Sequence, residues 1–319
     1  MAQTAPAEPS AETIRDRSWV YFNGRVCRYE DAHLGFMTHA LHYGTGIFEG
    51  IRAYWDDTRE QLWTFRMAEH YERMRANARI LQMRMPHPTA ELCAITLDLL
   101  KRNAFRSDTY IRPLIYKSAE VITPRLHSLP DGFGIYTSAM GNYVDIDSGL
   151  RCMVSTWRRI DDNMIPARAK CTGTYVNSAL AKSEAEQNGF DEAIFLNADG
   201  HVCEGSAENI FIVRGGRCIT PPPTDNILEG ITRATLIAVI TEDMGLEVLQ
   251  RSIDRTELYV ADEVFMCGTG AQVSPVTEID RRTIGDGEPG PLTLRLQSAY
   301  FDIVKGNNSK YQHWLTPAY

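Results

Sequence analysis

Short apolar segments, separated by turn-forming residues, are mixed with amphipathic segments along the whole chain, and this mixture limits the possible folds. Residues 19–29 predict a β-hairpin, because two apolar runs flank Asn23-Gly24, a pair that favours two-residue hairpin turns. Further short strands are predicted at 61–66, 110–116, 151–157, 193–197, 201–213, 217–220 and 263–267. Apolar residues at helical spacing predict helices at 67–82, 91–103, 175–188 and 232–244. Since hairpins and helices do not alternate strictly, the sequence predicts an α+β fold rather than a doubly wound parallel sheet.

The domain organisation is predicted from length and from a change in local composition. A chain of 319 residues is long enough for two domains. Residues 137–149 lose periodicity and gain turn formers, so we expect them to be an interdomain linker. The remaining predicted parts are a disordered arm at 1–17, a smaller N-terminal domain at 18–136 and a larger C-terminal domain at 150–319.

Charge and composition exclude several classes of function. With 33 Lys+Arg against 41 Asp+Glu, the net charge is −8, whereas a nucleic-acid binder needs a basic face. No run of 18 apolar residues is present, and the polar start has no signal-peptide core. Seven scattered cysteines without a C-x-x-C pair indicate reduced thiols rather than a disulfide framework or a zinc site. We therefore expect a cytoplasmic protein that binds no nucleic acid, no membrane and no metal.

Two motif-like patterns have ordinary interpretations. The segment Gly44–Gly50 resembles a dinucleotide fingerprint, but its third glycine falls one residue late and no strong apolar strand precedes it. His39 and His42 stand at helical spacing, but no carboxylate follows one turn later, so packing or hydrogen bonding is a better interpretation than a metal site.

Lysine is scarce, which makes each lysine worth weighing. The chain has six lysines, at positions 101, 117, 170, 182, 305 and 310. Lys182 stands one turn before Glu186, which indicates a surface ion pair, and Lys117 ends a predicted strand. Lys170 differs because it lies among small residues between a strand and a helix, where desolvation would lower its pKa and make it a nucleophile. On this evidence alone, a lysine in a surface loop is the more common outcome.

Five sequence blocks, taken in order, carry a family resemblance. Met37–Arg52 (MTHALHYGTGIFEGIR), Tyr110–Ile115 (YIRPLI), Glu204–Phe211 (EGSAENIF), Leu228–Arg233 (LEGITR) and Cys267–Gly270 (CGTG) resemble the branched-chain amino-acid aminotransferases. These are class IV, fold-type IV enzymes that use pyridoxal 5′-phosphate (PLP). The resemblance extends from about Trp19 to Gly306. It implies a small N-terminal α/β domain, a large C-terminal PLP-binding domain and an active site at their interface.

The resemblance also implies roles for individual residues, and these roles match what PLP requires. PLP needs an amine, which corresponds to Lys170, and an anion beside its pyridine nitrogen, which corresponds to Glu204. A helix N-terminus and a turn after a strand are suited to holding a phosphate. The residues that match the family's remaining cofactor contacts are Tyr175 at the phenolic oxygen, Leu228 against the ring, and Arg66, Gly230, Ile231, Thr232 and Thr269 at the phosphate.

The implied reaction is a ping-pong amino transfer between a hydrophobic, branched-chain L-amino acid and 2-oxoglutarate. In it the amino acid displaces Lys170 from its aldimine, and the freed lysine then acts as the general base. The implied partners are a small amino donor, a keto-acid acceptor and at least one further copy of the chain, in a homodimer or higher homo-oligomer. The residues that match the family's substrate pocket are Tyr43, Phe48, Arg52, Tyr110, Arg112, Tyr143, Thr269 and Gly270.

The chain departs from the family pattern at the rim of the substrate pocket. The segment 118–127 has no Gly-Met-Gly-Val loop, and Met140 stands where the family usually has tryptophan. Arg125 and His127 could instead meet a polar group. Side-chain specificity therefore stays open between a branched-chain enzyme, a transaminase for (R)-amines, D-amino acids or specialised metabolites, and a PLP lyase such as aminodeoxychorismate lyase.

Overall fold

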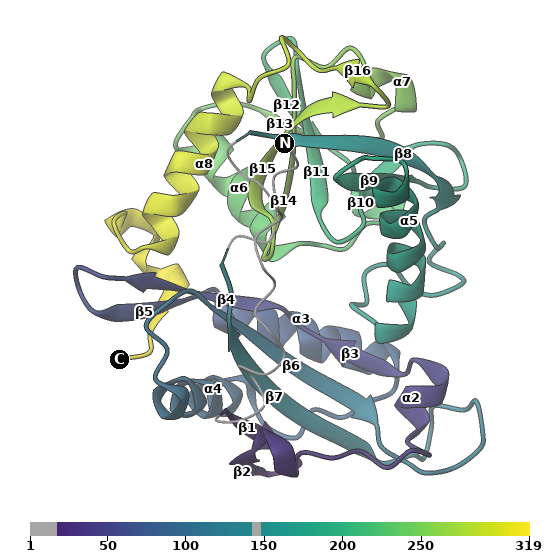
Figure 1. Cartoon of the computed structure of the whole chain (residues 1–319), viewed down its shortest axis with the longest axis vertical. Helices are drawn as coiled ribbons and strands as arrows, with labels where there is room; N and C mark the ends of the chain where they lie inside the picture. Colours follow the sequence, from purple (N-terminus) through teal and green to yellow (C-terminus); the bar gives the residue numbers. More distant parts are fainter. Residues whose placement is uncertain (1–17, 142–147) are drawn as a thin grey trace. The chain divides into compact units, whose positions relative to one another are not determined.

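The chain folds into two compact units, shown in a computed structural model that describes residues 18–141 and 148–319 (Figure 1). The first unit comprises Met1–Gly141 together with Val304–Tyr319, and the second comprises Asn142–Ile303. The predicted arm at 1–17 and residues 142–147 of the predicted linker lie outside the described residues.

The unit boundaries differ from the predicted ones at two places. Residues 137–139 belong to strand β7 (Asp131–Ala139), so the predicted linker at 137–149 begins too early. The predicted domain at 150–319 is too long, because residues 304–319 return to the first unit. There β17 (Leu315–Pro317) pairs antiparallel with β5 (Gln61–Phe65). Such long-range strand pairing leaves no local signal in a three-residue segment.

In the first unit, the described residues form one eight-stranded sheet of order β17-β5-β4-β6-β7-β1-β2, with β3 added beside β6. The predicted hairpin is confirmed as β1 and β2, and its two turn residues, Asn23 and Gly24, both have positive φ. The predicted helices at 67–82 and 91–103 are confirmed as α3 and α4. The other bounds are β1 Trp19–Phe22, β2 Arg25–Arg28, β3 Gly46–Phe48, β4 Ile51–Asp56, β6 Thr109–Lys117, α2 His39–Tyr43, α3 Met67–Ile80 and α4 Thr89–Asn103, with 3-10 turns at Tyr29–Asp31 and Ser309–Trp314.

The second unit contains a nine-stranded mixed sheet of order β10-β9-β8-β15-β14-β11-β12-β13, with β16 beside β15, among its described residues. The predicted strand at 201–213 is two strands, because the chain turns at 206–208. The bounds are β8 Leu150–Arg158, β9 Glu192–Leu196, β10 Val202–Gly205, β11 Asn209–Arg214, β12 Arg217–Thr220, β13 Val248–Gln250, β14 Glu263–Gly268, β15 Gln272–Ile279, β16 Arg282–Thr283, α5 Tyr175–Gln187, α6 Ile231–Glu242, α7 Arg255–Leu258 and α8 Pro291–Val304, with 3-10 turns at Thr172–Thr174 and Pro223–Asp225. The mixture of hairpins, parallel strands and helices confirms the α+β class.

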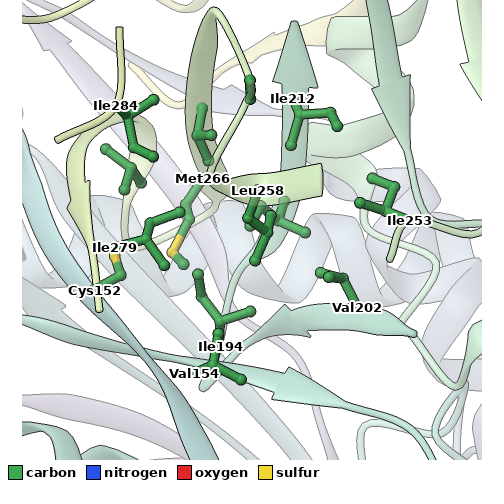
Figure 2. Close-up of a cluster of buried hydrophobic side chains, with 14 of the residues drawn as sticks. Cys152, Val154, Ile194, Val202, Ile212, Ile253, Leu258, Met266, Ile279 and Ile284 are labelled. Atoms are coloured by element: carbon green, nitrogen blue, oxygen red, sulfur yellow. The ribbon is translucent and has the colours of Figure 1, made fainter. Parts of the chain in front are cut away.

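A buried apolar cluster fixes the strands of the second unit (Figure 2). Ile194 on β9, Ile212 on β11 and Met266 on β14 are fully buried in it, and Leu258 of α7 packs against them from outside the sheet. Because protein interiors are close-packed, this cluster holds the ends of β10 and β11 in place. Those ends carry Glu204 and Asn209, which belong to the candidate site.

Among residues 18–141 and 148–319, no helix is long and apolar enough to span a membrane.

A fully buried carboxylate ties α3 to the strands of the first unit. Glu49, between β3 and β4, accepts hydrogen bonds from Arg73 Nε at 2.7 Å and Nη2 at 2.6 Å, and it pairs with His70 Nδ1 at 2.8 Å. Burial alone would raise the pKa of Glu49, but Arg73 and His70 outweigh that effect and lower the pKa to about 2. The ionised carboxylate therefore stabilises the folded state.

We predict that the variant Glu49→Gln loses a pH dependence that the parent chain has. A depressed folded pKa gives stability that is present above the unfolded value near 4.5 and is lost as the pH falls toward 2. The parent's free energy of unfolding should fall between pH 5 and 2.5 by about 2 kcal/mol more than that of the variant. Urea unfolding at several pH values measures this difference.

The matched control is Asp98→Asn. Asp98 pairs with Arg102 at 2.6 Å, but about half of each side chain is exposed, so solvent screens the pair. This variant should keep the parent's pH profile. Parallel profiles for Glu49→Gln and the parent would contradict the role given to Glu49.

Candidate active site

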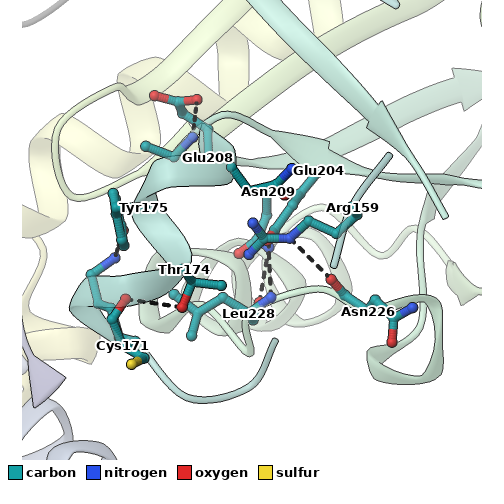
Figure 3. A network of polar contacts seen from close by, with 12 residues as sticks. Arg159, Cys171, Thr174, Tyr175, Glu204, Glu208, Asn209, Asn226 and Leu228 are labelled. Carbon is teal, nitrogen blue, oxygen red and sulfur yellow. Dashed lines mark hydrogen bonds and ion pairs between the residues drawn. The ribbon is translucent and has the colours of Figure 1, made fainter. Parts of the chain in front are cut away.

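Lys170 lies in the connection between β8 and α5, directly before the 3-10 turn Thr172–Thr174. The side chain is half-buried, and its Nζ donates a hydrogen bond to the Tyr175 hydroxyl at 2.8 Å. Thr174 fixes the intervening turn, because its hydroxyl donates to the Cys171 carbonyl at 2.9 Å (Figure 3). The structure therefore brings together an amine and a phenol that stand five positions apart in the sequence.

Glu204 is a buried carboxylate at the end of β10, with three nitrogen atoms around it (Figure 3). Arg159 Nη2 lies 2.7 Å from Oε1, while Leu228 N and Asn209 Nδ2 each donate to Oε2 at 3.0 Å. Burial raises the pKa of Glu204, and Arg159, the Leu228 N–H and the charge of Lys170 oppose this rise. The arrangement is suited to holding a negative charge beside a protonated ring nitrogen.

The start of α6 provides a site for an anion. Gly230 is the N-cap residue with φ −68° and ψ 136°, and no side chain caps this end of the helix. Thr232 is buried in the first turn, with 4% of its surface exposed. The backbone N–H groups and the positive end of the helix dipole at such a terminus favour a phosphate.

The second turn predicted to contact the phosphate follows β14. Thr269 and Gly270 form the turn between β14 and β15, and both residues are half-buried. Backbone N–H groups and the Thr269 hydroxyl at such a turn are the donors that phosphates and carboxylates take.

Three of the predicted substrate residues contact one another in the first unit. Arg112 donates from Nε at 3.0 Å and from Nη2 at 2.7 Å to the Tyr110 hydroxyl. Its guanidinium also lies 4.4 Å from the centre of the Phe48 ring. Gly50 makes room for this group, since a Cβ there would lie 2.4 Å from the Tyr110 hydroxyl. The group combines apolar surface with a positive charge that is held in place.

The other predicted residues of the first unit lie elsewhere. Arg52 is buried with 2% exposure, and it pairs with Asp108 at 3.1 Å and donates to the Gly141 carbonyl at 3.0 Å. Arg66 precedes α3 with φ 48°, and its Nε lies 3.0 Å from a Glu69 carboxylate oxygen. Tyr43 ends α2 and is 39% exposed. Tyr143 lies outside the described residues.

Sequence reasoning missed two residues of the network around Glu204. Arg159 follows β8, and its pairing with Glu204 spans 45 positions, which no local pattern reveals. The available signal was indirect, because a buried carboxylate needs a basic partner and Arg158-Arg159 follows a predicted strand. Asn209 lies inside the quoted Glu204–Phe211 block, but its amide contacts become evident only in the fold.

The described residues of the second unit fit the chemistry of PLP. The cofactor carries an aldehyde, a pyridine nitrogen and a phosphate, which need an amine, an anion and hydrogen-bond donors respectively. Lys170 supplies the amine, Glu204 supplies the anion, and the uncapped end of α6 supplies the donors. The Arg159–Glu204 ion pair accounts for how the anion can exist in a buried place.

Comparisons with known proteins agree with this geometry. The family model described as amino-transferase class IV matches residues 46–279. A probable branched-chain-amino-acid aminotransferase of Aquifex aeolicus is 50% identical over 301 residues, which are 94% of this chain and 97% of that protein.

Solved structures give the same result. The chain is similar to the branched-chain aminotransferase of Thermoproteus uzoniensis with norvaline, with a TM-score of 0.91, 43% identity and coverage of 95% and 99% of the two chains. It is also similar to the T.th. branched-chain amino acid aminotransferase complexed with N-(5′-phosphopyridoxyl)-L-glutamate, with a TM-score of 0.90, 40% identity and the same coverage. The chain therefore belongs to the class IV aminotransferase family and is a PLP-dependent enzyme.

Proposed function

We propose that this enzyme is a branched-chain amino-acid aminotransferase, which moves the amino group of a hydrophobic L-amino acid to 2-oxoglutarate in two half-reactions. The observation that carries the proposal is the pairing of Lys170 with Tyr175 in the unit that also holds the buried Arg159–Glu204 pair. The relatives support the substrate class, since those compared are named for branched-chain substrates and one was solved with a phosphopyridoxyl-glutamate.

When bound, PLP supplies a carbonyl that accepts the amino group and a ring that takes up electrons from the substrate. Lys170 is the residue placed to carry a proton from the substrate Cα to the acceptor carbon and back. The Tyr175 hydroxyl is within hydrogen-bond distance of the lysine Nζ, so it orients the amine between these steps. One lysine then serves both half-reactions, because the second is the reverse of the first.

Glu204 and Arg159 keep the electron-accepting end of the site charged. A carboxylate beside the ring nitrogen holds that nitrogen protonated, which strengthens electron withdrawal from the substrate. Arg159 at 2.7 Å makes the anion tolerable in its buried position. Leu228, whose backbone N–H binds the same carboxylate, matches the family residue that would lie against the ring of bound PLP.

The phosphate of the cofactor is assigned to the family's matching residues. Gly230, Ile231 and Thr232 offer the start of α6, and Thr269 offers the turn after β14. Arg66 of the first unit is the remaining residue that matches a phosphate contact of the family. A charged ligand held by several backbone N–H groups stays in one orientation, which fixes the reacting carbon relative to Lys170.

The substrate is assigned to the group formed by Phe48, Tyr110 and Arg112 of the first unit. In the second unit, Thr269 and Gly270 are the residues that match the family's substrate contacts. The two rings suit an aliphatic side chain, and the Arg112 guanidinium suits a carboxylate. The same guanidinium would let one site accept both a branched-chain amino acid and a dicarboxylic keto acid. Tyr43, Arg52 and Tyr143 complete the proposed set.

We further propose that the enzyme is a homodimer that buries an exposed apolar patch of the first unit. His39 joins the two segments of this patch, because its backbone N–H donates to the Ala119 carbonyl and its Nε2 lies 2.7 Å from the Thr123 carbonyl. Exposed apolar side chains gathered on one part of the surface mark an interaction site. Its members are Leu34, Phe36, Met37, Leu41, Tyr43, Val121 and Ile122.

The proposed location is the cytoplasm. Cysteines 27, 93, 152, 171, 203, 218 and 267 are free thiols, and free thiols persist in a reducing compartment.

We predict that Lys170→Ala abolishes turnover and that Tyr175→Phe weakens it. Removing the amine removes the proton carrier, so kcat should fall at least 1000-fold, in the upper part of the roughly 10²–10⁴-fold range of general acid–base catalysis. Losing the hydrogen bond that orients the lysine should lower kcat by about 10-fold. Coupled assays with L-leucine and 2-oxoglutarate measure both values, and the visible absorption of the purified protein reports whether PLP is bound.

A donor panel separates the substrate classes. L-leucine, L-isoleucine and L-valine should be consumed, while D-leucine and (R)-1-phenylethylamine should not. Consumption of only D-leucine and (R)-1-phenylethylamine would indicate a transaminase of different substrate specificity. Release of pyruvate from aminodeoxychorismate without a keto-acid acceptor would indicate a lyase. A fully active Lys170→Ala protein would overturn the mechanism.

We predict that Ile122→Asp converts the dimer to monomers. The Ile122 side chain is 89% exposed in the single chain, so a charge there is tolerated in the monomer but is buried without a partner in the dimer. The dissociation constant should rise at least 100-fold, measured by light scattering after size exclusion. The control Val260→Asp changes a 58% exposed residue of the second unit and should leave the dimer intact. A monomeric parent chain would refute the dimer proposal.

A further inference from the structure

We propose that Asn209 is a positioning residue for the cofactor, because its carboxamide joins the Glu204 carboxylate to the segment that leads into α6. This inference rests on the proposed function, since it assigns Glu204 to the pyridine nitrogen and the start of α6 to the phosphate. Asn209 lies inside the Glu204–Phe211 block, but neither the family resemblance nor the chemistry of PLP gave it a role in the sequence analysis.

The two N–H bonds of Asn209 Nδ2 go to different parts of the site. One reaches Glu204 Oε2 at 3.0 Å, and the other reaches the Leu228 carbonyl at 2.9 Å. Leu228 in turn donates its own N–H to Glu204 Oε2 at 3.0 Å. These three hydrogen bonds close a ring between β10, β11 and the segment before α6, as Figure 3 shows.

The oxygen of the same amide sets the spacing between Asn209 and Gly230. A Cβ built on Gly230 would lie 2.0 Å from Asn209 Oδ1, so the amide packs directly against this glycine. Gly230 is the N-cap residue of α6, where the phosphate is assigned. One side chain thereby sets how far the proposed nitrogen partner lies from the proposed phosphate site, a distance that has to match the cofactor.

The backbone of Asn209 is held firmly enough to serve as this reference point. Asn209 is the first residue of β11, pairs with Cys267 of β14, and is buried with 6% exposure. The turn before it is closed by a hydrogen bond from Gly205 N to the Glu208 carbonyl at 2.7 Å. Glu204 and Asn209 therefore lie on two strand ends whose separation the sheet determines.

Only an amide provides these contacts together. An aspartate at 209 would have the same shape, but it would set a carboxylate against the Glu204 carboxylate and against the Leu228 carbonyl. Two such close anions cannot both stay ionised in a buried place, so the negative charge at Glu204 would be weakened. An alanine would remove both N–H donors without adding a charge. The Glu204 carboxylate would then be held in position by Arg159 and the Leu228 N–H.

The test compares two ligands on cofactor-free protein: PLP and the carbocyclic analogue in which CH replaces the ring nitrogen. Both have the same aldehyde and phosphate, so the ratio of their dissociation constants reports the contact at the ring nitrogen. The parent chain should prefer PLP. Asn209→Asp should reduce that preference at least 10-fold, Asn209→Ala should reduce it by a smaller factor, and Glu204→Gln should remove it.

The matched control is Asn103→Asp in the first unit. Asn103 Nδ2 also donates twice, to the Trp19 carbonyl at 2.9 Å and the Thr137 hydroxyl at 2.8 Å, but no proposed cofactor contact involves it. This variant should keep the parent's ligand preference even if its melting temperature falls. Thermal melts of all the cofactor-free proteins separate loss of stability from loss of preference.

The outcomes separate the two levels of the argument. A parent chain that binds neither ligand would refute the proposed function itself. A parent that prefers PLP, with Asn209→Asp and Asn209→Ala keeping the whole preference, would refute the role of Asn209 alone. If the aspartate variant does not fold, the alanine variant decides, and an unchanged ratio in it overturns the inference.

Discussion

The site depends on a negative charge that is kept away from water. Glu204 is buried, and an isolated buried carboxylate would take up a proton instead of staying ionised. Arg159 at 2.7 Å and the N–H groups of Leu228 and Asn209 oppose that tendency. Glu204 and these three groups come from four separate segments of the second unit, so the charge exists only when the sheet and its connections are folded. The buried strand residues in Figure 2 hold these segments together, so the charge at Glu204 depends on that apolar cluster.

Each unit carries a different part of the chemistry. In the proposed function, the second unit holds the amine, the anion and most of the phosphate donors, which are the elements a PLP enzyme needs whatever its substrate. The first unit holds the Phe48–Tyr110–Arg112 group, whose rings and guanidinium are proposed to bind the substrate. The departures from the family pattern, in 118–127 and at Met140, also lie in the first unit.

Local sequence patterns predicted the elements whose signals are local. Asn23-Gly24 placed the first hairpin, and helical periodicity placed α3, α4 and α6 to within a few residues. The same patterns did not predict contacts between segments that lie far apart in the sequence. Lys182, expected to pair with exposed Glu186, lies closer to buried Glu192, at 3.0 Å against 3.6 Å. The return of residues 304–319 to the first unit depends in the same way on partners far away in the sequence.

The roles given to Lys170 and Glu204 rest on the five sequence blocks, because a loop lysine and a strand carboxylate have many ordinary uses.

Two of the buried glutamates, Glu49 and Glu204, differ in the number of basic side chains that donate to their carboxylates. This difference distinguishes a carboxylate that stabilises the fold from the one proposed to bind the cofactor. Glu49 receives three donors from two basic side chains, and its pKa falls to about 2. Glu204 has one basic side chain on Oε1 and neutral N–H donors on Oε2, and burial keeps its pKa raised. A carboxylate has about four lone-pair positions, so Oε1 of Glu204 retains capacity for one more donor. A protonated ring nitrogen is a donor of that kind, and it would fill the acceptor position that Arg159, Leu228 and Asn209 leave open.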